Sequence, residues 1–160
     1  MIILYDNCAI VKKMADKWCE DAVSVGSTHT KLAFDQNDTW SLKYNIVWDK
    51  LLDIGLFEEK IFANEVAWYK QKMKHYGVPL DSRKDYTKLD WLFWTTVMTS
   101  DKEYFTGVVD AVFDMICDTE DRVPMTDYYD TSDAHQRIFQ ARSVLGGIFI
   151  NFLVTIQDTP

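Results

Sequence analysis

The sequence contains no cluster of lysine or arginine residues, and its formal net charge is −8 over 160 residues. Nucleic acids and anionic membrane surfaces attract basic patches, so this charge distribution argues against both as partners. No apolar run is long enough to span a membrane either, because the longest one, at residues 146–150, ends at Asn151. We therefore expect no nucleic-acid partner and no membrane insertion.

Sequence motifs for cofactors, metals and activated serines are absent as well. The glycine pair at residues 146–147 is not part of a GxGxxG motif and follows no predicted strand, which argues against a dinucleotide site. The three histidines are scattered without an HExxH motif, and Ser143 lies outside any GxSxG motif. The three cysteines have no metal-ligand spacing, and we expect them to be buried free thiols. The sequence thus predicts no cofactor and no metal site.

The start of the chain, residues 1–4, lacks the basic and long apolar segments of a signal peptide. It resembles a helix that is entered part-way, which suggests a piece of a longer protein. The remaining sequence can build a core, since 48% of all residues are apolar, 14% are aromatic and six are tryptophans. Because no linker rich in proline, glycine and serine divides it, we expect residues 1–160 to form a single all-helical domain.

Hydrophobic periodicity predicts an all-α fold with helical hairpins. Helix starts are indicated by capping patterns at Thr87, Ser100 and Asp133. Gly146 and Gly147 inside the last predicted helix indicate a close approach of another backbone. The predicted helices cover residues 3–23, 41–54, 58–76, 87–98, 101–118 and 134–156, with a strand or extended arm at 30–35 and a long loop at 118–132.

The most informative connection, residues 79–91, carries three aspartates, three cations and two aromatic rings. Asp81 and Asp85 flank Arg83, and Asp90 lies in the first turn of the next predicted helix. Acid–base hydrolysis needs a proton donor and a base whose pKa values differ. Asp81, Asp85 and Asp90 are therefore the candidate catalytic residues. The structural alternative is an ion pair between Arg83 and Asp85, with Asp90 acting only as a helix cap.

Aromatic rings and one arginine provide candidate substrate-binding groups. Tyr44 and Trp48 lie one helical turn apart, and such rings either form a platform for a sugar or amide or pack in the core. Arg142 interrupts an apolar helix and could hold a carboxylate bidentately, either that of a ligand or that of a loop aspartate such as Asp127 or Asp130. The candidate substrate-binding residues are Tyr44, Trp48, Asp49, Arg83, Trp91 and Arg142.

Four blocks of sequence, in the same order, resemble the glutaminase A family of fungi and Bacteroides-type gut bacteria. They are TWSLKYNIVWDKLL at residues 39–52, GVPLDSRKDYTKLDW at 77–91, DRVP with DYYD at 121–130, and FQARSVLGG at 139–147. The resemblance extends from about Met14 to Leu153 and therefore covers nearly the whole chain.

The resemblance implies a fold and an activity that spacing alone does not give. Family members are longer, secreted or periplasmic proteins in which a β-rich part precedes an α/α toroid, and this chain resembles the C-terminal portion of the toroid. The expected fold is thus a set of helical hairpins similar to six-hairpin glycosidases. The implied reaction is hydrolysis of L-glutamine to L-glutamate and ammonia.

Two further hypotheses stay open beside the glutaminase. One is a carbohydrate-active toroid that works with paired carboxylates, for which the small-molecule substrate is a sugar rather than glutamine. The other is a non-catalytic helical fragment that packs against a missing N-terminal part or associates with itself through exposed apolar faces.

Overall fold

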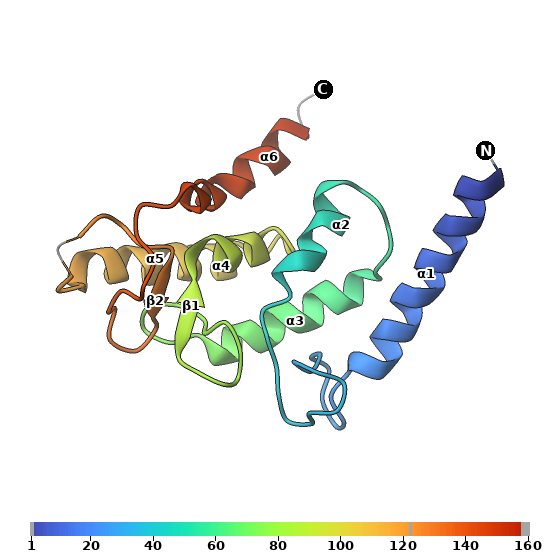
Figure 1. Cartoon of the computed structure of the whole chain (residues 1–160), viewed down its shortest axis with the longest axis horizontal. Coiled ribbons are helices and arrows are strands. Elements are labelled where there is room, and N and C mark those ends of the chain that lie inside the picture. The colour runs from blue at the N-terminus through green and yellow to red at the C-terminus, as the bar shows by residue number, and fades with distance from the viewer. Residues whose placement is uncertain (1, 122, 158–160) are drawn as a thin grey trace.

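The computed structural model describes residues 2–121 and 123–157, and it shows an all-α protein with one small β ribbon (Figure 1). The elements are α1 (Ile2–Ala22), η1 (Tyr44–Ile46), α2 (Val47–Leu51), α3 (Glu59–Lys72), β1 (Tyr86–Lys88), α4 (Leu89–Thr96), α5 (Lys102–Asp118), β2 (Tyr128–Asp130), η2 (Ser143–Phe149) and α6 (Ile150–Gln157), where η denotes a 3₁₀ helix.

Helix α4 lies at the centre of the molecule. It contacts η1, β1, α5, η2 and α6. Its residues Leu89 and Leu92 are fully buried, and they belong to a core that also includes Tyr69 of α3 and Val108 of α5. Each fully buried side chain of this kind stabilises the fold by about 1.5–3 kcal/mol. The site described below is built on the N-terminal end of this central helix.

Helix α1 confirms the predicted first helix and extends along one side of the molecule (Figure 1). Trp18 packs edge-on against Phe57 with ring centroids 5.6 Å apart, and Lys12 donates a hydrogen bond to the Leu56 carbonyl. The expected burial of the cysteines is wrong, since Cys8 on α1 and Cys117 on α5 are exposed and Cys19 on α1 is only half-buried.

The β ribbon, formed by β1 and β2, corrects two predictions. Its antiparallel register pairs Tyr86 with Asp130, Thr87 with Tyr129, and Lys88 with Tyr128. Thr87 is therefore a strand residue with a fully buried side chain and does not cap a helix. The predicted loop at 118–132 contains β2, because the backbone groups of residues 128–130 pair with β1 instead of being hydrated.

The first part of the last predicted helix, residues 134–142, is wrong. Residues 134–142 are not helical, and only η2 and α6 follow. Gln136 pairs with Tyr129 of β2, and the Arg137 amide donates to the Tyr128 carbonyl, so this segment adds to the ribbon edge. Ala134 at φ +61° and Ala141 at φ +49° bound the extended segment. Tertiary pairing with β2 thus overrides helix propensity here.

Three smaller differences concern the other helices. The helix predicted at 41–54 is reduced to η1 and α2, and residues 30–35 form no strand beyond one bridge between Thr30 and Val23. Helix α5 begins as predicted, but Asp101 rather than Ser100 caps it, since its carboxylate accepts hydrogen bonds from the Glu103 and Tyr104 amides.

Gly147 confirms the predicted close approach, because a Cβ atom at this position would lie 2.7 Å from the Asp90 Cβ atom and 2.9 Å from Trp94 Nε1. Gly146 has nothing within 4 Å of such an atom. The 3₁₀ helix η2 therefore lies directly on the first turns of α4. No helix in the described part of the chain is long and apolar enough to cross a membrane.

Candidate functional site

A buried cluster of opposite charges lies where the β ribbon meets α4. Lys88 of β1 forms an ion pair with Asp127, and Arg142 binds the same carboxylate bidentately, with Nε 3.0 Å from Oδ1 and Nη2 2.7 Å from Oδ2. Asp127 is fully buried and Lys88 nearly so. Burial alone would raise the pKa of Asp127, but the hydrogen bonds from Lys88 and Arg142 outweigh it and lower the pKa.

Asp90 is the second carboxylate of this cluster. Its Oδ1 lies 4.0 Å from Lys88 Nζ, and this oxygen is buried without a hydrogen-bond partner among the described residues. Burial raises the pKa of Asp90, and the negative charge of Asp127 adds to the effect. Lys88, Asp90, Asp127 and Arg142 are called the Lys88 cluster below.

The sequence places these four residues together through three local features. Lys88 ends β1 and Asp90 lies in the first turn of α4, so both project from one short segment. The amide of Leu89 donates to the Asp127 carbonyl, which holds the two segments in register. Arg142 immediately precedes η2, whose Gly147 packs on Asp90.

Asp81, another predicted catalytic residue, lies apart from the cluster in a pair with Arg83. Arg83 donates from Nε to Oδ1 at 3.0 Å and from Nη2 to Oδ2 at 2.7 Å. Burial works to raise the pKa of Asp81, but these hydrogen bonds lower it. The carboxylate is buried, whereas the Arg83 side chain is 62% exposed. The expected ion pair of Arg83 with Asp85 is therefore wrong.

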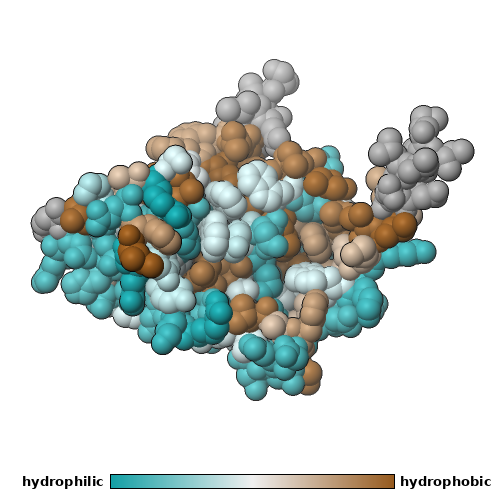
Figure 2. All heavy atoms as spheres, in the orientation of Figure 1, coloured by the Kyte–Doolittle hydropathy of each residue, from teal (hydrophilic) through white to brown (hydrophobic). Residues whose placement is uncertain are grey.

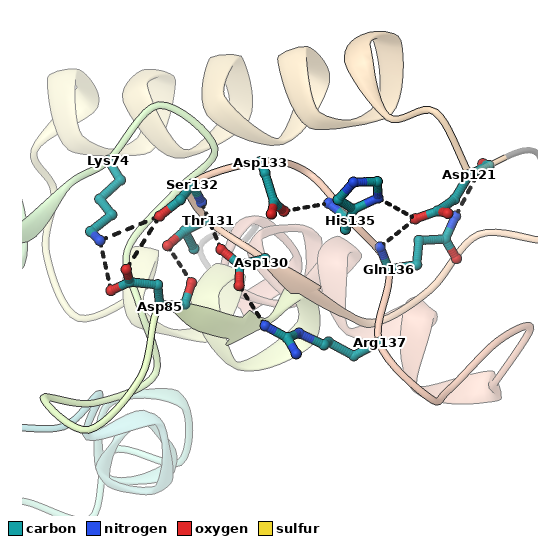
Figure 3. Close-up of polar contacts among 10 residues, drawn as sticks. All are labelled: Lys74, Asp85, Asp121, Asp130, Thr131, Ser132, Asp133, His135, Gln136 and Arg137. Atoms are coloured by element: carbon teal, nitrogen blue, oxygen red, sulfur yellow. Dashed lines mark hydrogen bonds and ion pairs between the residues drawn. The ribbon is translucent and has the colours of Figure 1, made fainter.

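Asp85 belongs to a surface network with Lys74 and Ser132 (Figure 3). Its carboxylate lies 2.6 Å from Lys74 Nζ, and its backbone carbonyl accepts hydrogen bonds from the Thr131 amide and hydroxyl. The hydrogen bond from Lys74 lowers the pKa of Asp85. Farther along the same network, Asp121 accepts from the Gln136 amide. This arrangement ties the loop before β1 to the segment after β2.

Asp49 supports a loop rather than the cluster. It accepts hydrogen bonds from the amides of Leu56 and Phe57, at 2.8 and 3.1 Å, and so fixes the connection between α2 and α3. Both carboxylate oxygens are thereby used within the fold. Its predicted role in substrate binding has no support in this geometry and stays a prediction.

The candidate aromatic rings pack in pairs. Tyr44 stacks on Trp91 with centroids 3.8 Å apart and planes 9° apart, and Trp48 meets Trp94 edge-on at 5.2 Å. The Tyr44–Trp91 stack lies beside the cluster, since Lys88 Nζ is 5.4 Å from the Trp91 ring centroid. Burial raises the pKa of Tyr44, and the charge of Asp90 raises it further.

Sequence reasoning missed the outer face of the β ribbon. Side chains alternate along a strand, so Thr87 and Tyr129 face the core while their neighbours lie on the opposite face, called the outer face, where Lys88 and Asp130 are nevertheless buried. Four outward residues are thereby brought together, and Arg137 joins them through Asp130 (Figure 3). They are Tyr86, Lys88, Tyr128 and Asp130. The triplets YTK and YYD that form the two strands are too short to show strand alternation, and they fall in a predicted helix start and a predicted loop.

The cluster combines two carboxylates with opposite pKa shifts around one ammonium group. Burial raises the pKa of Asp90, whereas the hydrogen bonds from Lys88 and Arg142 lower the pKa of Asp127. Such a pair is the arrangement from which acid–base chemistry is built. No group of three or more histidine, cysteine, aspartate or glutamate side chains that could hold a metal ion occurs in the part of the chain that the structure describes.

The fold and the site together define an all-α helical domain that carries a buried acid–base cluster. A family model of the glutaminase A six helical-hairpin domain matches residues 4–152, so the chain belongs to the glutaminase A family.

Two curated relatives have glutaminase names. Glutaminase A of Aspergillus oryzae is 30% identical over 151 residues, which cover 90% of this chain and 21% of the relative. A protein of Arthroderma benhamiae named probable glutaminase is 27% identical over 178 residues, covering 90% of this chain and 20% of the relative. The chain thus spans about a fifth of the length of these relatives. No solved structure matches it.

Proposed function

We propose that this chain carries the acid–base part of a glutaminase active site, which hydrolyses the side-chain amide of L-glutamine to L-glutamate and ammonia. One observation carries the proposal: Asp90, with a raised pKa, lies 4.0 Å from the same Lys88 ammonium that pairs with the ionised Asp127. The glutaminase names of the two relatives support the choice of substrate.

The proposed reaction assigns one proton-transfer role and one electrostatic role. Protonated Asp90 donates its proton to the leaving amide nitrogen while water adds to the carbonyl carbon. As the carbon–nitrogen bond breaks and ammonia leaves, the Asp90 carboxylate takes a proton from the added water, so the residue ends as it began. Asp127 stays ionised and holds Lys88 and Arg142, whose positive charges stabilise the developing oxyanion.

The test is an assay of products. The protein is incubated with L-glutamine, and ammonia and L-glutamate are measured, with the Aspergillus relative as the positive control. We expect the two products in equal amounts and above the level of a heat-denatured sample. Unchanged glutamine under conditions in which the relative is active would contradict the proposal.

A carbohydrate-active site is the second candidate, favoured by one observation. Trp48 is 40% exposed and, with Trp94, lines a pocket of about 240 Å³ beside Gly147. An exposed tryptophan at a pocket wall can stack on a sugar ring. Trp91 is less suitable, because Tyr44 covers one of its faces. A change in tryptophan fluorescence with a glycan panel, absent in Trp48→Ala, would support this candidate over the first.

We also propose that an exposed apolar face of the chain packs against another helical segment, either of a longer protein or of a second copy. Hydrophobic residues gather along the edge of the molecule where α6 and the loop after α2 lie (Figure 2). The exposed apolar side chains there are Leu52, Ile54, Phe149, Phe152 and Leu153. Placement of a longer parent protein in the periplasm or outside the cell stays a prediction of the family resemblance.

A further inference from the structure

The face of the β ribbon that carries Lys88 also carries a second group of polar side chains, which includes Tyr86 of β1 and Tyr128, the cross-strand partner of Lys88. Tyr86 and Tyr128 meet there edge-on, with ring centroids 4.9 Å apart. The guanidinium of Arg137 lies 5.9 Å from the Tyr86 ring centroid. Arg83 follows Asp81 by two residues. The hydrogen bonds to Asp81 raise the pKa of Arg83, and the electrostatic interaction of Arg83 with both tyrosines contributes to the raised pKa. Two arginines and two phenols therefore surround one patch of the ribbon.

This patch contains more hydrogen-bond donors than its own hydrogen-bond acceptors can use. Arg137 uses Nη2 to bind Asp130 at 2.6 Å, and the contacts within the described residues leave its Nε and Nη1 hydrogens for a ligand. Arg83 likewise uses Nε and Nη2 on Asp81 and leaves Nη1. Both aspartates are buried, whereas the two arginine side chains are 47% and 62% exposed. The solvent side of the patch therefore presents N–H groups rather than carboxylates.

The two tyrosines add neutral donors to this surface. Burial and the neighbouring Tyr86 hydroxyl raise the pKa of Tyr128 to about 12, so its phenol stays protonated at neutral pH. Guanidinium groups and phenols that converge in this way match the oxygen atoms of a carboxylate, which accepts hydrogen bonds from a planar fork.

We propose that Arg137, together with Arg83 and the hydroxyl groups of Tyr86 and Tyr128, holds the α-carboxylate of the amino-acid substrate. The inference rests on the proposed hydrolysis of glutamine and names the residues that select an α-amino acid. Arg137 lies in the segment after β2 and binds Asp130 of the ribbon (Figure 3). We assign to Arg137 the selection of the α-carboxylate.

The spacing along β1 fits this assignment. Tyr86 and Lys88 lie two residues apart on the same face, a distance of about 7 Å along a strand. An extended five-carbon amino acid spans such a distance between its terminal oxygen atoms. A glutamine whose α-carboxylate lies at Tyr86 and Arg137 would thus present its side-chain amide at Lys88 and Asp90. Phe139 lies beside the paired Tyr128 and Lys88, with its ring centroid 5.8 Å from that of Tyr128 and 5.5 Å from Lys88 Nζ.

The experiment compares binding of L-glutamine with binding of L-glutaminamide, which lacks the α-carboxylate, by calorimetry on the whole chain. We expect Arg137→Gln to weaken L-glutamine binding about tenfold or more, because a charge-assisted hydrogen bond is lost. L-glutaminamide should bind weakly to the wild type and equally weakly to the variant. Lys84→Gln is the matched control: it removes the same charge from the exposed loop and should change either affinity less than twofold.

Three results would overturn the assignment. They are unchanged L-glutamine binding in Arg137→Gln, equal weakening in Lys84→Gln, and absence of L-glutamine binding by the wild type. Tyr128→Phe, which removes one hydroxyl and no charge, provides a second test that does not disturb Asp130, and it should weaken L-glutamine binding severalfold. Failure of the proposed function gives a different result. If L-glutamine binds in an Arg137-dependent way but no ammonia is released, the proposed hydrolysis is contradicted while the carboxylate site is supported.

Discussion

At the scale of single residues, the two carboxylates of the Lys88 cluster should respond oppositely to pH. The folded-state pKa of Asp90 lies above its ordinary value of 3.8, so its stabilising contribution is complete below pH 3.8 and is lost as the pH rises through the raised value. Asp90→Asn removes this loss. We expect the variant to be more stable than the wild type at pH 7 and equally stable at acidic pH, as measured by urea unfolding across pH. A variant that is less stable than the wild type at pH 7 would contradict the raised pKa.

Asp127 should behave in the reverse sense. Its folded-state pKa is lowered, so its contribution is present above pH 3.8 and is lost as the pH falls through the lowered value. Asp127→Asn leaves Lys88 and Arg142 without their shared charge, and breaking a buried pair in this way costs about 3–5 kcal/mol. Urea unfolding at pH 7 measures the change in the free energy of unfolding. A decrease of less than about 1 kcal/mol would contradict a stabilising role of the ion pairs of Asp127.

At the scale of elements, the contact between η2 and α4 depends on one glycine of a pair. Gly147→Ala should destabilise the protein by about 1–3 kcal/mol, because the new Cβ atom would meet Asp90 and Trp94 below 3.0 Å. Gly146→Ala is the matched control and should be neutral or slightly stabilising, since nothing lies within 4 Å. Thermal unfolding of both variants measures the difference, and equal melting temperatures would contradict the contact.

The start of α5 offers a second test of an element. Asp101→Ala should cost about 1 kcal/mol, because its carboxylate caps the helix through the Glu103 and Tyr104 amides. Ser100→Ala should change the stability little, although the sequence pattern pointed to Ser100 as the cap. The free energy of unfolding of the two variants decides between the two caps, and a larger loss for Ser100→Ala would restore the sequence prediction.

Local patterns predicted α1, α3 and α5 because each carries a stripe of apolar residues at helical spacing, and they predicted α4 from a capping pattern at Thr87. They failed at the β ribbon, where three-residue strands are too short to show alternation against a background of helix signals. The same limit applies to the site. Asp90, Trp91 and Arg142 were recognisable from their residue types, and the bidentate pair of Arg142 with Asp127 confirms one of the two alternatives predicted for Arg142. The connection through Lys88 depends on strand register, which no local pattern contains.

At the scale of the whole molecule, the exposed apolar face should make the isolated chain associate. Phe149, Phe152 and Leu153 of η2 and α6 are each at least half exposed, and contiguous surfaces of this kind are rare on monomers. We expect light scattering at micromolar concentration to show species larger than 18.7 kDa, and Phe152→Ser to shift the distribution toward the monomer. A monodisperse monomer of the wild type would contradict this expectation.

The most direct test of the central claim is the rate of ammonia release from L-glutamine in two variants that distinguish the carboxylates of residues 79–91. Asp90→Asn removes the proposed proton donor, whereas Asp85→Asn changes a carboxylate that pairs with Lys74 at the surface. We expect Asp90→Asn to lower the rate at least about a hundredfold, which is the typical contribution of a positioned proton donor. Asp85→Asn should keep the rate within about twofold. Retention of the wild-type rate by Asp90→Asn, or loss of it in Asp85→Asn alone, would contradict the assignment of the acid–base site to the Lys88 cluster.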